Sequence, residues 1–179
     1  AQAHQLLISE GARQLLKTKD GLNLFGVCER ALGRPANAVR AYLMSLQINI
    51  KQAGVWTNLG NAYKDLNKLA SSLECHKIAS EMSSVGDAQI LHNMGIAASL
   101  ENNHGLAISL FEKALSIDSK RVEVRWDLAR SQLALFDYKN GWSNYQYRWS
   151  SKDAGPRRYQ SKIWSGESLI GETIFVYAE

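Results

Sequence analysis

The sequence predicts an all-α fold, a superhelical solenoid of antiparallel helix pairs, with a short β-strand segment at its C-terminal end. Three observations support this prediction. A pattern of small and large residues recurs about every 34 residues along the chain. Only two prolines, Pro35 and Pro156, occur in 179 residues, which permits long helices. Hydrophobic residues make up 45% of the chain and charged residues 21%, a composition typical of a folded domain.

The repeat is clearest in the segment VWTNLGNAYKDL. Here Trp56, Leu59, Gly60 and Tyr63 form the W-x2-L-G-x2-Y signature of the tetratricopeptide repeat. Four copies start at residues 19, 53, 88 and 122, and their spacings are 34, 35 and 34 residues. An ordinary helical bundle is the rival interpretation, but it gives no reason for four copies to keep one spacing.

Small residues mark where the two helices of each pair should cross. Gly60 and Gly95 are expected on the first helices, and Ala107 and Gly141 on the second helices. His76 replaces the aromatic residue usual in its copy. The aromatic residues expected to fill the space between neighbouring repeats are Trp56, Tyr63 and Phe111. One helix pair cannot bury its apolar stripe alone, so the copies should stack into a solenoid with a concave groove.

This pattern divides the chain into four parts. Residues 1–18 are interpreted as one helix of a preceding repeat, and residues 19–150 as four repeats. Residues 151–172 are expected to form a basic linker. Residues 173–179 are expected to form a strand, because they are rich in β-branched and aromatic residues.

The concave groove is predicted from the helical period of about 100° per residue. Asn58, Asn61 and Asp65 lie opposite the Trp56 side of their helix and should face the groove. The equivalent polar residues of the next two copies complete the predicted peptide-binding set, Asn93, Asp127 and Arg130. An Asn side chain offers a donor and an acceptor together, so a row of them could hold an extended peptide backbone.

The segment NLGNAYKDLNKL also resembles the repeats of O-linked N-acetylglucosamine transferases. That resemblance implies an asparagine ladder, which Asn58 and Asn93 match; Asp127 matches only in part, and the first copy has Leu24. The alternative is that these asparagines are merely tolerated on a solvated helix face. A Lys/Asn clamp for a C-terminal carboxylate is a further alternative, but only Arg130 qualifies clearly for it.

No pattern in the sequence indicates catalysis. The four histidines form no pair at metal-ligand spacing, and nucleotide-binding or nucleophile motifs do not occur. We therefore expect no catalytic residue, no metal and no cofactor. Cys28 and Cys75 are interpreted as free thiols of a reducing compartment, which favours the cytoplasm, and no apolar run is long enough to span a membrane.

The positive charge is concentrated near the C-terminal end. Residues 148–162 carry five basic residues against one acidic residue, whereas the rest of the chain is neutral. Arg157 and Arg158 are candidates for binding an anionic ligand, and a solvated linker is the simpler alternative. Nucleic-acid binding is not predicted, because it usually needs basic residues spread over a face.

The end of the chain resembles a junction found in bacterial tetratricopeptide proteins. GWSNYQYRW, a basic loop, and KIWSGESLIGETIFVYAE resemble the segment that leads from the last repeat into a glycosyltransferase-like domain. The resemblance implies that residues 173–179 are the first strand of such a domain, and that this fragment is the non-catalytic, protein-binding part of a glycosyltransferase. A free-standing scaffold for a cell-envelope or regulatory complex is the alternative. The unpaired edges of a lone strand also predict a homodimer formed through it.

Overall fold

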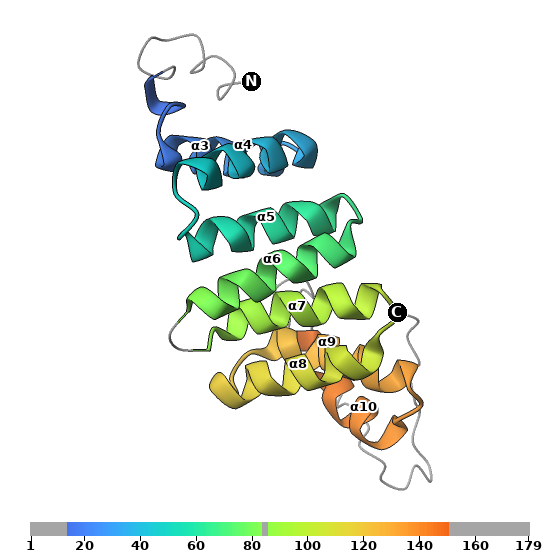
Figure 1. The fold of residues 1–179 in the computed structure, drawn as a ribbon. Coiled ribbons are helices and arrows are strands. Elements are labelled where there is room, and N and C mark those ends of the chain that lie inside the picture. The colour runs from blue at the N-terminus through green and yellow to red at the C-terminus, as the bar shows by residue number, and fades with distance from the viewer. Residues whose placement is uncertain (1–13, 84–85, 151–179) are drawn as a thin grey trace, which may run out of the picture.

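The computed structural model describes residues 14–83 and 86–150, and within these ranges every regular element is a helix (Figure 1). The α-helices pair as α3 (Lys19–Ala31) with α4 (Pro35–Ile48), α5 (Ala53–Asp65) with α6 (Leu69–Met82), α7 (Ala88–Leu100) with α8 (His104–Ile117), and α9 (Val122–Ala134) with α10 (Tyr138–Tyr145). A short 3-10 helix, η1 (Gln146–Ser150), follows α10 and packs against α9. None of these helices is long and apolar enough to cross a lipid bilayer.

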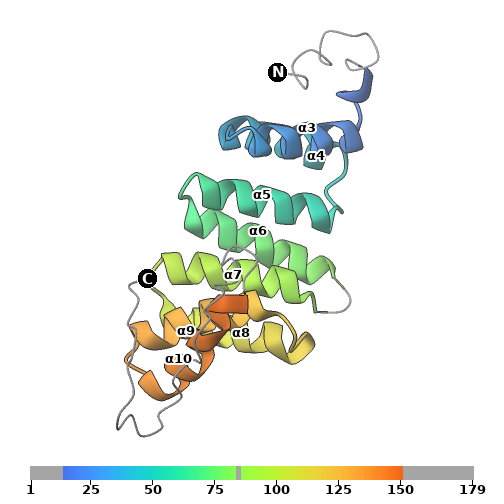
Figure 2. The same cartoon turned by 180° about the vertical axis from the view of Figure 1, so that it is seen from behind.

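The helix pairs stack in chain order from α3 and α4 to α9 and α10 (Figures 1 and 2). Each second helix contacts the first helix of the next pair. The first helices α3, α5, α7 and α9 also contact one another in succession, whereas the second helices of neighbouring pairs approach each other less closely. The first helices therefore line the inner side of a curved stack.

In the first three pairs a glycine on the first helix meets a ring on the second, whereas in the fourth pair Gly141 on α10 meets Leu133 of α9. A Cβ atom added to the glycine would lie 2.4 Å from Tyr42 at Gly26, 2.8 Å from His76 at Gly60, and 2.4 Å from Phe111 at Gly95. Any side chain at these positions would push the helices apart. The sequence prediction that Gly60 and Gly95 mark the crossing points is confirmed.

The turn between the helices of each pair contains one residue with a left-handed backbone. These residues stand at the same place in all four repeats and are Gly33 (φ 72°), Asn67 (57°), Asn102 (59°) and Phe136 (61°). Glycine and asparagine adopt this conformation readily. Phe136 is unusual, because a bulky residue pays a steric cost there.

The apolar core divides into two clusters at the middle of the stack. One joins α4, α5 and α6 around Tyr42 and Leu59, and Trp56 and Tyr63 pack against it. The other joins α7, α8 and α9 around Phe111. Trp56 is only half-buried, and its indole N–H donates a hydrogen bond to the carbonyl of Ile50, 2.9 Å away.

The fold-class prediction needs one correction. The all-α repeat solenoid is confirmed, but the predicted strand is wrong as part of the observed fold, since the described residues 14–83 and 86–150 contain no β-strand. A strand needs a neighbouring strand to satisfy its backbone hydrogen bonds, and the helical stack supplies none. Residues 173–179, and the dimer expected through them, lie outside the described residues.

Candidate functional site

The inner face is crossed by polar bridges between first helices of successive repeats. Three bridges join residues that are 35 positions apart: Asn23 with Asn58 (3.1 Å), Arg30 with Asp65 (2.6 Å), and His92 with Asp127 (2.8 Å). Positions within each repeat are counted from its first residue. In each bridge, a residue at a given position in one repeat contacts the residue one position further along in the next repeat. We refer to this regularity as the one-step register.

Two of the predicted groove residues on α5 take part in these bridges. The amide nitrogen of Asn58 donates to the side-chain oxygen of Asn23. The carboxylate of Asp65, at the end of α5, accepts hydrogen bonds from the guanidinium of Arg30 at 2.6 and 3.4 Å. Asn61 is half-buried on the same helix and has no hydrogen-bond partner within the described part of the chain. All three residues thus belong to α5, but only Asn61 keeps its amide unoccupied.

The predicted groove residue Asn93 is largely buried on α7. Only 6% of its surface is exposed, and its side-chain oxygen accepts a hydrogen bond from the amide of Gln89 at 3.0 Å. The guanidinium of Arg121 in turn donates to the side-chain oxygen of Gln89. The Asn93 side chain therefore lies deeper than Asn58, so the two do not present equal amides to a ligand.

The predicted residues Asp127 and Arg130 come together on α9. The carboxylate of Asp127 lies 2.8 Å from Nε2 of His92 and 3.4 Å from the guanidinium of Arg130. His92 is buried and packs edge-on against the Phe111 ring. Because His92 already holds the carboxylate, the Arg130 pair is the longer and weaker contact, and the Arg130 side chain stays 61% exposed.

The junction between the second and third repeats lacks such a bridge. The one-step register would match Lys64 on α5 with Leu100 on α7, and an ammonium group cannot pair with an aliphatic side chain. The Lys64 ammonium has no hydrogen-bond or ion-pair partner among the described residues. Leu100 is 54% exposed. Both a cation and an apolar side chain are therefore left unsatisfied at this junction.

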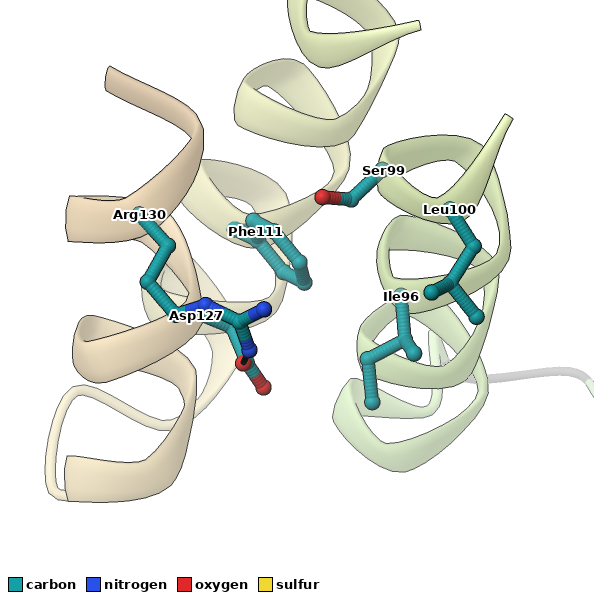
Figure 3. Close-up of a pocket in the computed structure, with 6 residues that line it drawn as sticks. All are labelled: Ile96, Ser99, Leu100, Phe111, Asp127 and Arg130. Atoms are coloured by element: carbon teal, nitrogen blue, oxygen red, sulfur yellow. Dashed lines mark hydrogen bonds and ion pairs between the residues drawn. The ribbon is translucent and has the colours of Figure 1, made fainter. Parts of the chain in front are cut away.

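A small open pocket lies at the next junction, between α7 of the third repeat and α9 of the fourth (Figure 3). Its empty volume is about 250 Å³, including the solvent at its mouth. The residues that line it are Ile96, Ser99, Leu100, Phe111, Asp127 and Arg130. Figure 3 shows Ile96 and Leu100 on α7 facing Arg130 and Asp127 on α9, with Phe111 lying behind them. The pocket thus combines an apolar wall with one exposed guanidinium.

The described titratable side chains near the pocket form no metal-binding group and are already paired. Within residues 14–83 and 86–150, no group of three or more His, Cys, Asp or Glu side chains could hold a metal ion. The acidic side chain of the pocket, Asp127, is paired with both His92 and Arg130. Arg157 and Arg158, the predicted anion-binding residues, lie outside the described residues.

Sequence reasoning missed the partners Asn23, Arg30 and His92, and also the apolar wall of the pocket. The signal was present, because each missed partner stands 35 residues before a predicted groove residue, one more than the repeat period of 34. Comparing neighbouring repeats one position out of register would have found all three.

Comparisons with known proteins agree with this architecture. The tetratricopeptide repeat family profile matches residues 53–77 and 88–121. The crystal structure of MamA superposes with a TM-score of 0.70 at 14% identity, covering 84% of this chain and 85% of that one. YrrB, described as a TPR protein with an unusual peptide-binding site, gives 0.64 at 10% identity, with coverages of 84% and 75%.

A third solved structure is the first TPR of Spaghetti (RPAP3) bound to the HSP90 peptide SRMEEVD. It gives a TM-score of 0.63 at 19% identity, covering 66% of this chain and 93% of that one. A search of curated proteins finds no match. At such low identities these likenesses establish the fold alone. The profile thus identifies tetratricopeptide repeats at residues 53–77 and 88–121, and the solved structures show the same fold for the stack as a whole.

Proposed function

We propose that this chain is a non-catalytic interaction module that binds an extended peptide segment of a partner protein along the inner face of α5, α7 and α9. The observation that carries the proposal is the open pocket on that face, which has Leu100 on one wall and Arg130 on the other. An exposed apolar side chain next to an exposed cation is suited to recognising a segment of protein.

The solved structures of similar fold support this proposal. One of them holds a bound HSP90 peptide, and another is described by its peptide-binding site. The fold presents a row of first helices on one face, across which an extended segment can contact several repeats at once. Binding through several repeats would let a short segment gain affinity from many weak contacts.

The asparagine ladder remains part of the proposal in a reduced form. Asn58 and Asn93 already use their amides to hold Asn23 and Gln89. Asn61 is the groove amide with both a donor and an acceptor unoccupied among the described residues. We therefore expect Asn61 to contribute more to peptide binding than Asn93, which is buried.

The wider context of the module is also proposed. The resemblance of residues 141–179 to a junction before a glycosyltransferase-like domain supports a role as the non-catalytic part of a bacterial glycosyltransferase, with residues 19–150 as the binding repeats and residues 151–172 as the linker. Cys28 and Cys75 are free thiols, which supports a cytoplasmic location. A free-standing scaffold is the second candidate. Transferase activity, on a peptide bound by the repeats, of a chain that carries these repeats together with such a domain would favour the first candidate over the second.

A peptide selection tests the binding function. Random 12-residue peptides displayed on phage are selected against immobilised residues 1–179, and the enriched peptides are synthesised for measurement of Kd. Asn61→Trp fills the inner face, and Lys77→Trp places the same bulk on an exposed position of α6 as a matched control. We expect Asn61→Trp to abolish binding and Lys77→Trp to leave it unchanged. Failure to enrich any peptide, or equal effects of the two variants, would contradict the proposal.

A further inference from the structure

The acidic side chains of the first helices are already neutralised. Asp20 pairs with Lys19 at 2.9 Å, Glu29 with Arg34 at 3.7 Å, Asp65 with Arg30 at 2.6 Å, and Glu123 with Arg121 at 2.9 Å. Asp127 is held by His92 and Arg130. The inner face therefore has no carboxylate on its described first helices that lacks a basic partner.

Two cations on the same helices keep binding capacity. The Lys64 ammonium has no partner among the described residues. The Arg130 guanidinium has one long contact, 3.4 Å to Asp127, although a guanidinium has five N–H groups to donate. Both side chains therefore keep N–H groups that can donate to a carboxylate of an acidic ligand.

The two cations lie on the two first helices that flank α7, which carries Leu100 of the pocket wall. Lys64 lies on α5, Arg130 on α9, and Leu100 on α7, the helix between them. Extending the one-step register to the junction of α5 and α7 would place Lys64 opposite Leu100, and Figure 3 shows Arg130 facing Leu100 from the other side. The wall is therefore flanked by positive charge along the direction in which the repeats stack.

We propose that the pocket receives an aliphatic side chain of the bound segment, and that acidic residues before and after it pair with Lys64 and Arg130. This inference rests on the proposed peptide-binding function and names the chemistry of the segment. Helices in contact lie about 8–10 Å apart, so α5 and α9 are separated by roughly 20 Å. An extended chain advances about 3.3 Å per residue, and the two long cationic side chains shorten the span. The two acids should therefore stand about four to six residues apart, with the aliphatic residue between them.

The same peptide selection, run on residues 1–179, tests the pattern. Enriched 12-residue peptides are synthesised with an acetylated N-terminus and an amidated C-terminus, so that a terminal carboxylate cannot supply the charge. Each peptide is also made with its acids replaced by glutamine. Their Kd values are measured by fluorescence polarisation against the parent chain, Arg130→Gln, Lys64→Gln and Leu100→Ala. Arg40→Gln, at an exposed position of α4, is the matched control for loss of one arginine.

We expect enriched peptides to carry the acidic–aliphatic–acidic pattern. Arg130→Gln and Lys64→Gln should each weaken the acidic peptides about three- to tenfold, and the glutamine peptides should show no further loss. Leu100→Ala should weaken both peptide forms, and Arg40→Gln neither.

Peptides that bind the inner face without acids, or whose Kd is unchanged by Arg130→Gln and Lys64→Gln, would overturn the inference while leaving the binding function intact. Binding that requires a free C-terminal carboxylate would overturn it as well. If no peptide is enriched at all, both proposals fall together.

Discussion

The second and third repeats are built to the same plan but differ in the ring that joins their helices. In the third repeat, Phe111 packs against Gly95 and is fully buried at the centre of an apolar cluster. In the second, His76 occupies the equivalent place against Gly60 and is also fully buried. Neither ring nitrogen of His76 has a hydrogen-bond partner among the described residues. One pair thus buries a hydrocarbon ring and the other buries two unpaired polar atoms.

This difference shows that shape and chemistry are separate requirements at the crossing point. Both rings fill the space above a glycine, so both pairs need a glycine at the crossing point. Burying an unpaired polar atom costs free energy, however, whereas burying a phenyl ring releases it. Burial, reinforced by the nearby Lys64 charge, also lowers the pKa of His76 from 6.5 to about 4. The second repeat should therefore be the weaker of the two.

The largest expected effect comes from removing each ring. Phe111→Ala should lower the free energy of unfolding by about 3–5 kcal/mol, because a large cavity opens in the core. His76→Ala should cost less, about 1–2 kcal/mol, since the lost packing is offset by removing two unpaired nitrogens. Urea unfolding followed by circular dichroism measures both. Equal losses would show that the two rings contribute alike and that the comparison has no energetic basis.

The next effect is a pH dependence that belongs to the second repeat. The folded state holds His76 neutral down to about pH 4, whereas the unfolded chain takes up its proton near pH 6.5. The unfolded state therefore binds more protons between these values, so stability falls as the pH decreases from 6.5 to 4. The loss should approach about 3 kcal/mol.

The matched control for this pH dependence is His76→Phe. Subtracting the unfolding curve of His76→Phe from that of the parent chain at each pH isolates the contribution of His76 from other titrating groups. If the difference is the same at pH 7 and at pH 4.5, His76 is not the group responsible.

The same substitution should also stabilise the second repeat at neutral pH. His76→Phe removes two buried nitrogens that lack partners and restores the ring found in the third repeat, so we expect a gain of about 1–2 kcal/mol. Thermal unfolding at pH 7 measures it. A loss of stability would mean that the space above Gly60 is too small for a phenyl ring, since overpacking also destabilises.

Much of this fold could be predicted from the sequence, because the repeat period and the crossing glycines are properties of local spacing. The first helices begin at Lys19, Ala53, Ala88 and Val122, which are the residues from which the four sequence copies are counted. The left-handed turn residues could also have been read from Gly33, Asn67 and Asn102. Phe136 could not, since a phenylalanine gives no sign that it adopts a positive φ.

The candidate site was harder to predict, because its properties depend on pairs of repeats. Helical periodicity placed Asn58, Asp65 and Arg130 on first helices, but it could not show which of their charges and amides are neutralised. That outcome depends on how far one repeat is displaced against the next, which a single copy does not encode. The strand at residues 173–179 was predicted from composition and from a resemblance, without a partner strand in the sequence to test it against.

The smallest expected effect concerns the junction between the second and third repeats. Extending the one-step register to this junction would place Lys64 opposite Leu100. Asp65 holds the equivalent position in the second repeat, also as the last residue of its helix, and pairs with Arg30 at 2.6 Å. Leu100→Asp should therefore create the missing ion pair with Lys64 and gain roughly 0.3–1 kcal/mol, the range for an exposed pair. Little packing should be lost, since Leu100 is 54% exposed.

A double-mutant cycle of Leu100→Asp with Lys64→Ala, measured by urea unfolding at low salt, isolates the coupling between the two side chains. A coupling near zero would show that the register does not continue across this junction, where the corresponding residues are 36 rather than 35 positions apart.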